Sequence, residues 1–224
     1  MPRTDSAVSR DDADGLSTIR PRQSRFKKGL ANPGAALRYV TARARGRWTI
    51  LWCRLLGRRV TAGRNFRVAG RLVIRGPGRV IFGDDVNIER VVTPWTNTPE
   101  AVIEIGSNSY LNGTRFGCSE RITIGPHAIL SDASIADTNA HSTHVDRHSP
   151  DAPIRVKPVV LEENVWLGSA VGVLPGTRIG RNSVVGYGAV CAGIYPANSI
   201  IAGNPARVVK RVPGAPPDTD TPKA

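Results

Sequence analysis

The chain has 224 residues and a formal net charge of +13, and aromatic residues make up only 5% of it. No apolar run approaches the ~18 residues of a membrane-spanning helix, and the N-terminus lacks the apolar core of a signal peptide. Three cysteines form no even disulfide framework, so we expect one soluble, cytoplasmic domain with reduced thiols and a core of aliphatic side chains.

The positive charge lies in the N-terminal third. The first 79 residues hold 19 Lys and Arg against 4 Asp and Glu, and the remainder holds 12 against 14. Residues 1–30 are polar and irregular, which predicts a disordered basic tail. Residues 31–60 predict an amphipathic helix that begins near Asn32-Pro33 and ends at Gly57. Its apolar face at helical spacing consists of Leu37, Val40, Ala44, Trp48, Leu51 and Leu55.

Two interpretations of this apolar face stay open. The helix can pack on the end of the β-helix, as helices of globular proteins pack on their core. Alternatively, Ile50, Trp52 and Leu56 widen the face and arginines flank it, which favours a peripheral membrane contact. That contact would run through residues 35–60. Nucleic acid is not expected as a partner, because no aromatic-interleaved basic groove or motif accompanies the charge.

Residues 61–204 contain a repeat with a period of six. An aliphatic or thiol residue returns at Leu161, Leu167, Val173, Ile179, Val185 and Cys191. Four places after each of the first five comes a small or β-branched residue, from Val165 to Ala189. This period is typical of a parallel β-helix, in which three repeats form a coil of about 18 residues and equivalent positions stack. We therefore expect Leu161 over Ile179, Leu167 over Val185 and Val173 over Cys191.

One long loop interrupts the repeat. Ile124 and Leu161 are 37 positions apart, one coil plus 19 residues, so a loop must leave the β-helix over residues 137–158. It contains three histidines, and an imidazole on a rigid scaffold can take a proton from a hydroxyl near pH 7. His141 is nearest the coil wall and is our candidate base, whereas we interpret His144 and His148 as solvated. No metal is expected, because no Cys pair or HExxH helix lies nearby.

The last repeats and the C-terminus add further candidates. Trp166 stands where the repeat favours a small residue, so its indole must point outward, toward a ligand or a neighbouring subunit. A short C-terminal helix is predicted over residues 205–212. There Arg207 and Lys210, three positions apart, would share one side and could bind a phosphate together. Residues 213–224 predict a disordered tail.

Three motifs carry a resemblance to a known family. They are PVVLEENVWLGSAVGVLPGTRIGRNSVVGYGAV, SIIAGNPARVVKRV, and D-x-x-x-H from Asp137 to His141. Over residues 102–212 the chain resembles the hexapeptide-repeat acyltransferases, particularly the maltose and galactoside O-acetyltransferases and the colanic-acid and O-antigen acetyltransferases. The resemblance implies an all-β fold, a left-handed parallel β-helix with an N-terminal helix and a short C-terminal helix. It also implies a homotrimer that transfers acetyl from acetyl-CoA to a hydroxyl in clefts between subunits.

The same resemblance implies roles for residues near the reacting thioester. His141 corresponds to the catalytic base. Trp166, Gly168 and Ser169 match positions that line the pantetheine end of acetyl-CoA, with the Ser169 N–H placed to hold the thioester oxygen. Tyr187 matches a small residue beside the CoA tunnel.

At the nucleotide end of acetyl-CoA the correspondence is less complete. Ala192 and Gly193 match a Thr-Lys pair of the family, so one phosphate contact of that Lys is lost. Arg207 and Lys210 match the two basic residues at this end.

For the acceptor, Asn112 matches a binding Asn and Glu120 lies near an acidic contact. Asp137, which opens the D-x-x-x-H motif, is grouped with them. The acceptor is expected to be a saccharide, whether free, nucleotide-linked or lipid-linked. Transfer is expected to be direct, because no motif places Cys118 or Cys191 as a nucleophile.

Two functions of other classes stay open. A γ-type carbonic anhydrase shares this fold and would bind zinc through histidines of adjacent subunits, for which His127 is the only coil-borne candidate. A non-enzymatic β-helix scaffold is the other alternative, although it would need neither a histidine-bearing loop nor a basic C-terminal cap.

Overall fold

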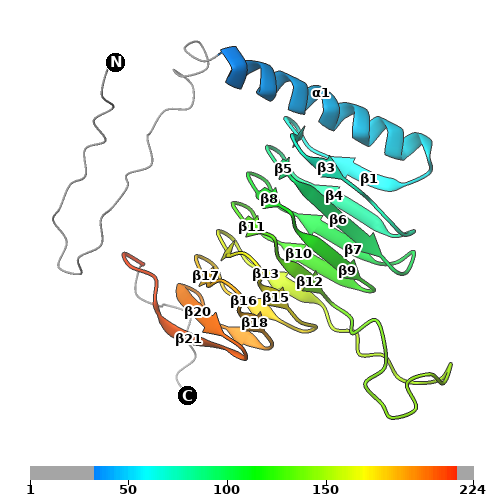
Figure 1. Ribbon diagram of the computed structural model, residues 1–224, viewed down its shortest axis with the longest axis vertical. Coiled ribbons are helices and arrows are strands. Elements are labelled where there is room, and N and C mark those ends of the chain that lie inside the picture. Colours follow the sequence, from blue (N-terminus) through cyan, green and yellow to red (C-terminus); the bar gives the residue numbers. More distant parts are fainter. Residues whose placement is uncertain (1–32, 216–224) are drawn as a thin grey trace, which may run out of the picture. The chain divides into compact units, whose positions relative to one another are not determined.

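The computed structural model describes residues 33–215 (Figure 1). The chain divides into two units, Met1–Leu37 and Arg38–Ala224, and of the first only residues 33–37 are described. The tail predicted over residues 1–30, and the part of the C-terminal tail beyond residue 215, lie outside the described residues.

From residue 59 to residue 203 the chain winds into a parallel β-helix with three sheets, each receiving one strand per coil (Figure 1). Sheet 1 is formed, in hydrogen-bonded order, by β1 (Arg59–Ala62), β4 (Arg79–Phe82), β7 (Val102–Ile105), β10 (Arg121–Ile124), β13 (Val159–Leu161), β16 (Arg178–Ile179) and β19 (Ile194–Tyr195). Sheet 2 is formed by β2 (Arg67–Val68), β5 (Asn87–Glu89), β8 (Tyr110–Asn112), β11 (Ile129–Ser131), β14 (Trp166–Leu167), β17 (Val184–Val185), β20 (Ser199–Gly203) and β21 (Ala206–Arg211). Sheet 3 is formed by β3 (Arg71–Leu72), β6 (Val91–Thr96), β9 (Arg115–Cys118), β12 (Ser134–Ala136), β15 (Gly172–Val173) and β18 (Val190–Cys191).

The stacking predicted from the six-residue period is confirmed. Leu161 pairs with Ile179. Its counterparts on the other sheets are the pairs Leu167 with Val185 and Val173 with Cys191. All six side chains are buried, so each coil covers the apolar face of the preceding one and supplies the hydrogen-bond partners of its strands.

The sheets meet at three edges, which organise the functional residues. We call edge 1/2 the corners that lead from sheet 1 to sheet 2, and name edges 2/3 and 3/1 in the same way. Along edge 1/2, Asn164, Asn182 and Asn198 adopt positive φ. The Nδ2 of Asn164 donates to Asn182 Oδ1 at 2.9 Å, and the Nδ2 of Asn182 donates to Asn198 Oδ1 at 3.0 Å. The long loop leaves along edge 3/1, between β12 and β13.

Helix α1 (Pro33–Leu55) lies within the predicted range but packs with an unexpected face. Its buried residues are Ala42, Gly46 and Ile50, whereas Trp48 and Leu55 of the expected apolar face are exposed. A side chain added at Gly46 would lie 2.5 Å from the Phe66 carbonyl oxygen, so small residues permit this close approach. The helix does pack on the end of the β-helix, where Ile50 joins the core cluster, but the face that packs is not the one that the apolar spacing indicates.

The predicted C-terminal helix at 205–212 is also wrong, because this segment forms strand β21. Without a further strand, β20 would end sheet 2 with unpaired backbone N–H and C=O groups. Strand β21 folds back antiparallel to β20 and pairs with these groups. Arg207 lies opposite Ala202 and Lys210 opposite Ile200, with a bulge between these pairs. Directly opposed residues share a face of the sheet, and Ala202 and Ile200 lie on the same face of β20. Arg207 and Lys210 therefore lie on one side of the sheet, as expected, but the reason is the bulge and not a helical spacing.

Candidate active site

Asp137 is the first residue after β12, where the histidine-bearing loop begins, and its side chain is fully buried. Its Oδ1 accepts the N–H of Ser119 at 2.7 Å, and its Oδ2 accepts those of Glu120 at 2.8 Å and Arg121 at 2.7 Å. The Cys118 thiol also donates to Oδ2 at 3.3 Å. Both oxygens thus hold the corner of the coil below, and assigning Asp137 to acceptor binding is corrected: it is a positioning residue.

The two ends of the loop pair with each other above this corner. The Lys157 N–H donates to the Asp137 carbonyl at 2.8 Å, and the Asn139 N–H donates to the Arg155 carbonyl at 3.1 Å. The His141 N–H in turn donates to the Asn139 carbonyl at 2.6 Å. His141 therefore sits directly beyond a paired stem, with its side chain exposed. His144 lies further out and contacts Asp146, its Nδ1 3.7 Å from a carboxylate oxygen.

A cavity of about 250 Å³ opens at the foot of this stem. Asn139, Arg155 and Lys157 line it from the loop, and residues 174–176 with 192–193 line it from the next two corners of edge 3/1. Neither Arg155 nor Lys157 takes part in an ion pair among residues 33–215. Sequence reasoning missed both cations, although they stand in PIRVKP, directly before the most family-like stretch.

Of the residues expected near the thioester, Gly168, Ser169 and Tyr187 lie on edge 2/3, and Trp166 lies in β14, the strand of sheet 2 that leads to this edge. Trp166 is 48% exposed and Tyr187 81%, so both aromatic rings point outward. The N–H of Gly168 donates to the Val185 carbonyl and that of Ala170 to the Asp132 carbonyl. By contrast, the Ser169 N–H between them has no partner among the described residues. Ser169 itself is half-buried.

A single chain does not bring the two groups together. His141, Glu120 and the corner at 192–193 belong to edge 3/1, whereas Ser169 belongs to edge 2/3 and Trp166 to the strand of sheet 2 just before it. Asn112 ends strand β8 at edge 2/3, where it pairs with Ser131. The full width of sheet 3 therefore separates Asn112 from Glu120.

The buried thiols differ chemically from an activated cysteine. Burial raises the pKa of Cys118 to about 12, and the neighbouring Asp137 carboxylate adds to the rise. Burial likewise raises the pKa of Cys191 to about 11. Both thiols stay protonated at neutral pH, and a protonated, buried thiol is a poor nucleophile.

The titratable side chains form no cluster suited to a metal. Within residues 33–215, no three His, Cys, Asp or Glu side chains come together at a distance that would hold an ion.

The sequence of this chain is similar to those of known acetyltransferases. The family model "Bacterial transferase hexapeptide (six repeats)" matches residues 158–193. A galactoside O-acetyltransferase of Lactococcus lactis is 38% identical over 91 residues, which cover 41% of this chain and 44% of that protein. The chain thus spans less than half the length of this relative. A putative lipopolysaccharide biosynthesis O-acetyl transferase of Escherichia coli, WbbJ, is 31% identical over 162 residues, covering 68% of this chain and 71% of the relative.

A solved structure is similar as well. The structure of a galactoside acetyltransferase in complex with coenzyme A superposes with a TM-score of 0.51 and 26% sequence identity. The superposition covers 63% of this chain and 66% of the other.

Proposed function

The chain belongs to the hexapeptide-repeat transferases, and on this premise we propose that it is an acetyl-CoA-dependent O-acetyltransferase acting on a saccharide hydroxyl. The observation that carries the proposal is the 31% identity to a putative O-acetyl transferase over 71% of that relative. The galactoside acetyltransferase with bound coenzyme A supports the choice of acyl donor. Both sugar-directed relatives favour a saccharide as the acceptor.

His141 is the proposed general base. Its imidazole removes the proton of the acceptor hydroxyl while the hydroxyl oxygen attacks the thioester carbon of acetyl-CoA. The free N–H of Ser169 donates to the oxyanion that forms, and the intermediate collapses with release of the CoA thiolate, which takes up the proton. The high pKa values of the buried thiols favour this direct transfer over a covalent acyl-enzyme.

We propose a homotrimer because the site is divided between two edges of one protomer. Placing edge 3/1 of one copy against edge 2/3 of the next would bring His141 toward Trp166 and Ser169 across the interface. Three such contacts close a ring around a three-fold axis. The 48% exposed Trp166 would then lie in the cleft between subunits.

For the donor, we assign the phosphates of acetyl-CoA to cationic side chains. Arg155 and Lys157 line the cavity at residues 192–193 and supply the charge that Gly193 lacks. Arg207 and Lys210, on one face of sheet 2, form a second anion contact. Gly168 and Tyr187 flank the path of the pantetheine arm.

For the acceptor, we keep Asn112 and Glu120 as proposed contacts from different subunits. Lipid-linked and nucleotide-linked saccharides are both compatible with an open cleft. We place the protein in the cytoplasm, where acetyl-CoA is available and where its three free cysteines stay reduced. No helix among residues 33–215 is long and apolar enough to cross a bilayer.

The proposal is tested by incubating the purified protein with acetyl-CoA and a panel of saccharides. We expect release of free CoA thiol that depends on the saccharide, with a product heavier by one acetyl group. Hydration of carbon dioxide that is lost on chelation would instead identify a γ-type carbonic anhydrase. No turnover of any acyl donor across the panel would favour a non-enzymatic scaffold.

A further inference from the structure

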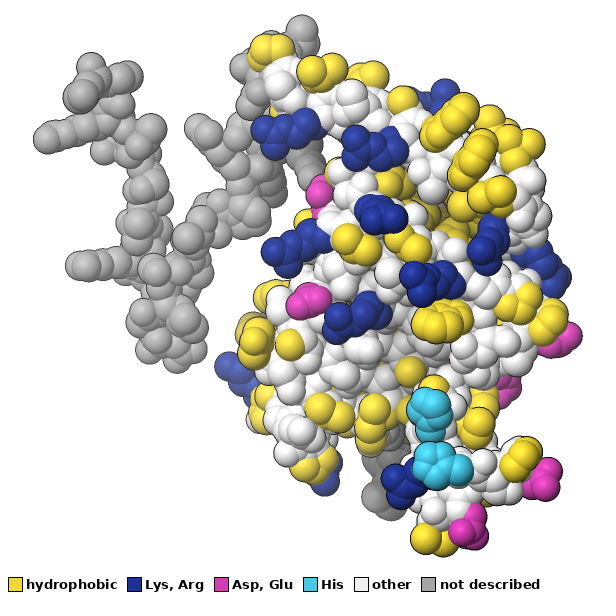
Figure 2. Space-filling view, turned by 45° about the vertical axis from the view of Figure 1, so that its right-hand side comes forward, with side chains coloured by type: hydrophobic (Ala, Val, Ile, Leu, Met, Phe, Trp, Pro, Cys, Tyr) yellow, Lys and Arg dark blue, Asp and Glu magenta, His cyan; other side chains and the backbone are white. Residues whose placement is uncertain are grey.

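The outer face of α1 carries a stripe of large apolar side chains. Trp48, Leu51, Trp52 and Leu55 recur at helical spacing and are 64%, 50%, 53% and 70% exposed. The indoles of Trp48 and Trp52 stack with their centroids 6.3 Å apart. Figure 2 shows hydrophobic side chains gathered over the helix at the top of the molecule. A contiguous apolar patch of this kind marks an interaction surface.

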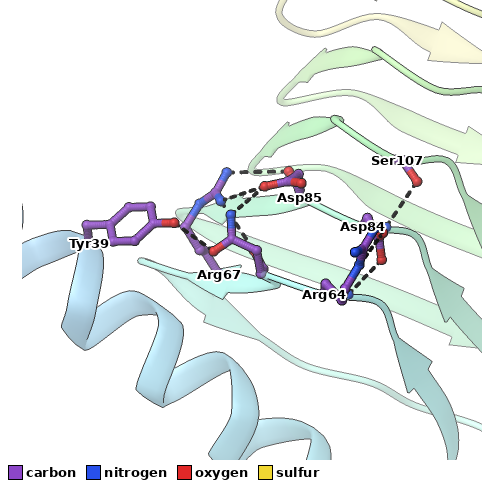
Figure 3. A network of polar contacts seen from close by, with 7 residues as sticks. Tyr39, Arg64, Arg67, Asp84, Asp85 and Ser107 are labelled. Carbon is purple, nitrogen blue, oxygen red and sulfur yellow. Dashed lines mark hydrogen bonds and ion pairs between the residues drawn. The ribbon is translucent and has the colours of Figure 1, made fainter. Parts of the chain in front are cut away.

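The helix is held so that this stripe must face outward. Its opposite face is buried, and Gly46 lies against the backbone of Phe66. The Tyr39 hydroxyl donates to Asn65 Oδ1 at 2.7 Å, and the Arg67 guanidinium lies 5.4 Å from the centre of the Tyr39 ring (Figure 3). Asn65 also donates to Asp85 of the next coil. Rotating the stripe inward would break these contacts.

Arginines flank the stripe on both sides. The helix contains five arginines and no Asp or Glu. Helical spacing places Arg43, Arg47 and Arg54 along one flank and Arg38 and Arg45 along the other. All three arginines of the first flank line a cavity of about 310 Å³ between the helix and the first coil.

The composition of this cavity suits an amphiphilic ligand. Ile50 and Leu51 contribute apolar wall, while Arg43 and Arg47 take part in no ion pair among the described residues. Arg64 also lines the cavity, but its guanidinium is paired with Asp84 at 2.8 Å. Two arginines are thus available for an incoming anion.

We propose that α1 docks the protein on an anionic lipid bilayer. The aromatic and leucine stripe enters the boundary between headgroups and acyl chains, and a lipid phosphate binds between Arg43 and Arg47. The planar guanidinium groups match phosphate oxygens in bidentate geometry. Apolar burial and attraction to acidic headgroups together give the binding that neither gives alone.

A second copy of the chain is a poorer occupant of this surface. A symmetric contact would bring the arginines of α1 against the same arginines, with no carboxylate on the helix to pair with them. The docked orientation also leaves the proposed active site free. Figure 2 shows the histidines on the protruding loop, at the end opposite the helix. The inference does not depend on acetyl transfer.

The test is sedimentation of the full-length protein with vesicles. We expect binding to vesicles of phosphatidylglycerol and phosphatidylcholine in about 0.1 M salt, and little binding to phosphatidylcholine alone. Binding should weaken in about 1 M salt, where the screening length falls to about 3 Å. The double variant Arg43→Gln/Arg47→Gln should lower the affinity about 30-fold, since each basic residue at such a surface contributes about a factor of five.

Two further variants make the result specific. Trp48→Ser/Trp52→Ser should lower the affinity about tenfold or more without changing the oligomeric state. The control Arg79→Gln/Arg115→Gln removes the same charge from exposed positions of β4 and β9 and should bind like the native protein. Equal loss in the control would overturn the headgroup site. Absence of vesicle binding, or dissociation of an oligomer by the tryptophan variant, would overturn membrane docking and favour a protein partner.

Discussion

Replacing Asp137 with Asn tests whether the buried Asp137 carboxylate stabilises the start of the histidine-bearing loop. Three backbone N–H groups donate to its oxygens at 2.7, 2.8 and 2.7 Å. An Asn side chain keeps a single acceptor oxygen, and its amide must then face at least one of these donors. The better of its two orientations keeps Oδ2 and leaves the Ser119 N–H unpaired.

The expected loss follows from these contacts. One buried, unpaired N–H costs about 1–3 kcal/mol, and the remaining bonds weaken because a neutral acceptor replaces a carboxylate. We expect Asp137→Asn to lower the free energy of unfolding by about 2–4 kcal/mol. Urea unfolding followed by tryptophan fluorescence measures it, with Asp151→Asn on the exposed part of the loop as the matched control. A difference below about 0.5 kcal/mol between the variants would refute the role assigned to Asp137.

Three further outcomes are expected. His141→Ala should lower kcat about 10²–10⁴-fold with little change in the KM for acetyl-CoA, and His148→Ala should cost little; the reverse result would move the base to His148. Arg207→Glu/Lys210→Glu should raise the KM for acetyl-CoA strongly and that for the acceptor slightly, with a smaller effect at high salt; an unchanged KM places the nucleotide elsewhere. Burial raises the pKa of Cys118 from about 9 in the unfolded chain to about 12 in the folded protein, so the fold favours the protonated thiol. The contribution of this preference to the free energy of unfolding is complete below pH 9 and should fall as the pH rises from 9 toward 12. Urea titrations of native protein and Cys118→Ala at pH 8 and pH 10 check the sign, and a native protein that gains stability relative to the variant at pH 10 would contradict it.

The coils were predictable because their information is local and repeated. Leu161, Leu167 and Val173 indicate the six-residue period. The pairing of Leu161 with Ile179 follows from this period, because three repeats form one coil. The excursion between β12 and β13 was predictable for the same reason, since a phase that resumes after 37 positions requires an insertion. Amino-acid composition alone predicted neither the coils nor the loop.

The candidate site was only partly visible in the sequence. The motif around Asp137 and His141 drew attention to the loop, but spacing alone could not distinguish a buried carboxylate from a ligand contact. The hydrogen bonds to the corner at 119–121 decide that question. Arg155 and Lys157 were missed because nothing in their local sequence indicates that the loop folds back over the corner at 192–193.

By itself, the sequence determined the β-helix, its phase, the position of the loop and the presence of an N-terminal helix. Each of these depends on a period or a motif that acts within a few neighbouring repeats. Only the tertiary structure decided that α1 packs through Gly46 and leaves Trp48 exposed, and that the segment containing Arg207 is a strand. These outcomes depend on which surface of another segment is open, the backbone beside Phe66 in one case and the unpaired edge of β20 in the other. Hydrophobic spacing within a segment carries no record of such partners, because they are separated from it along the chain.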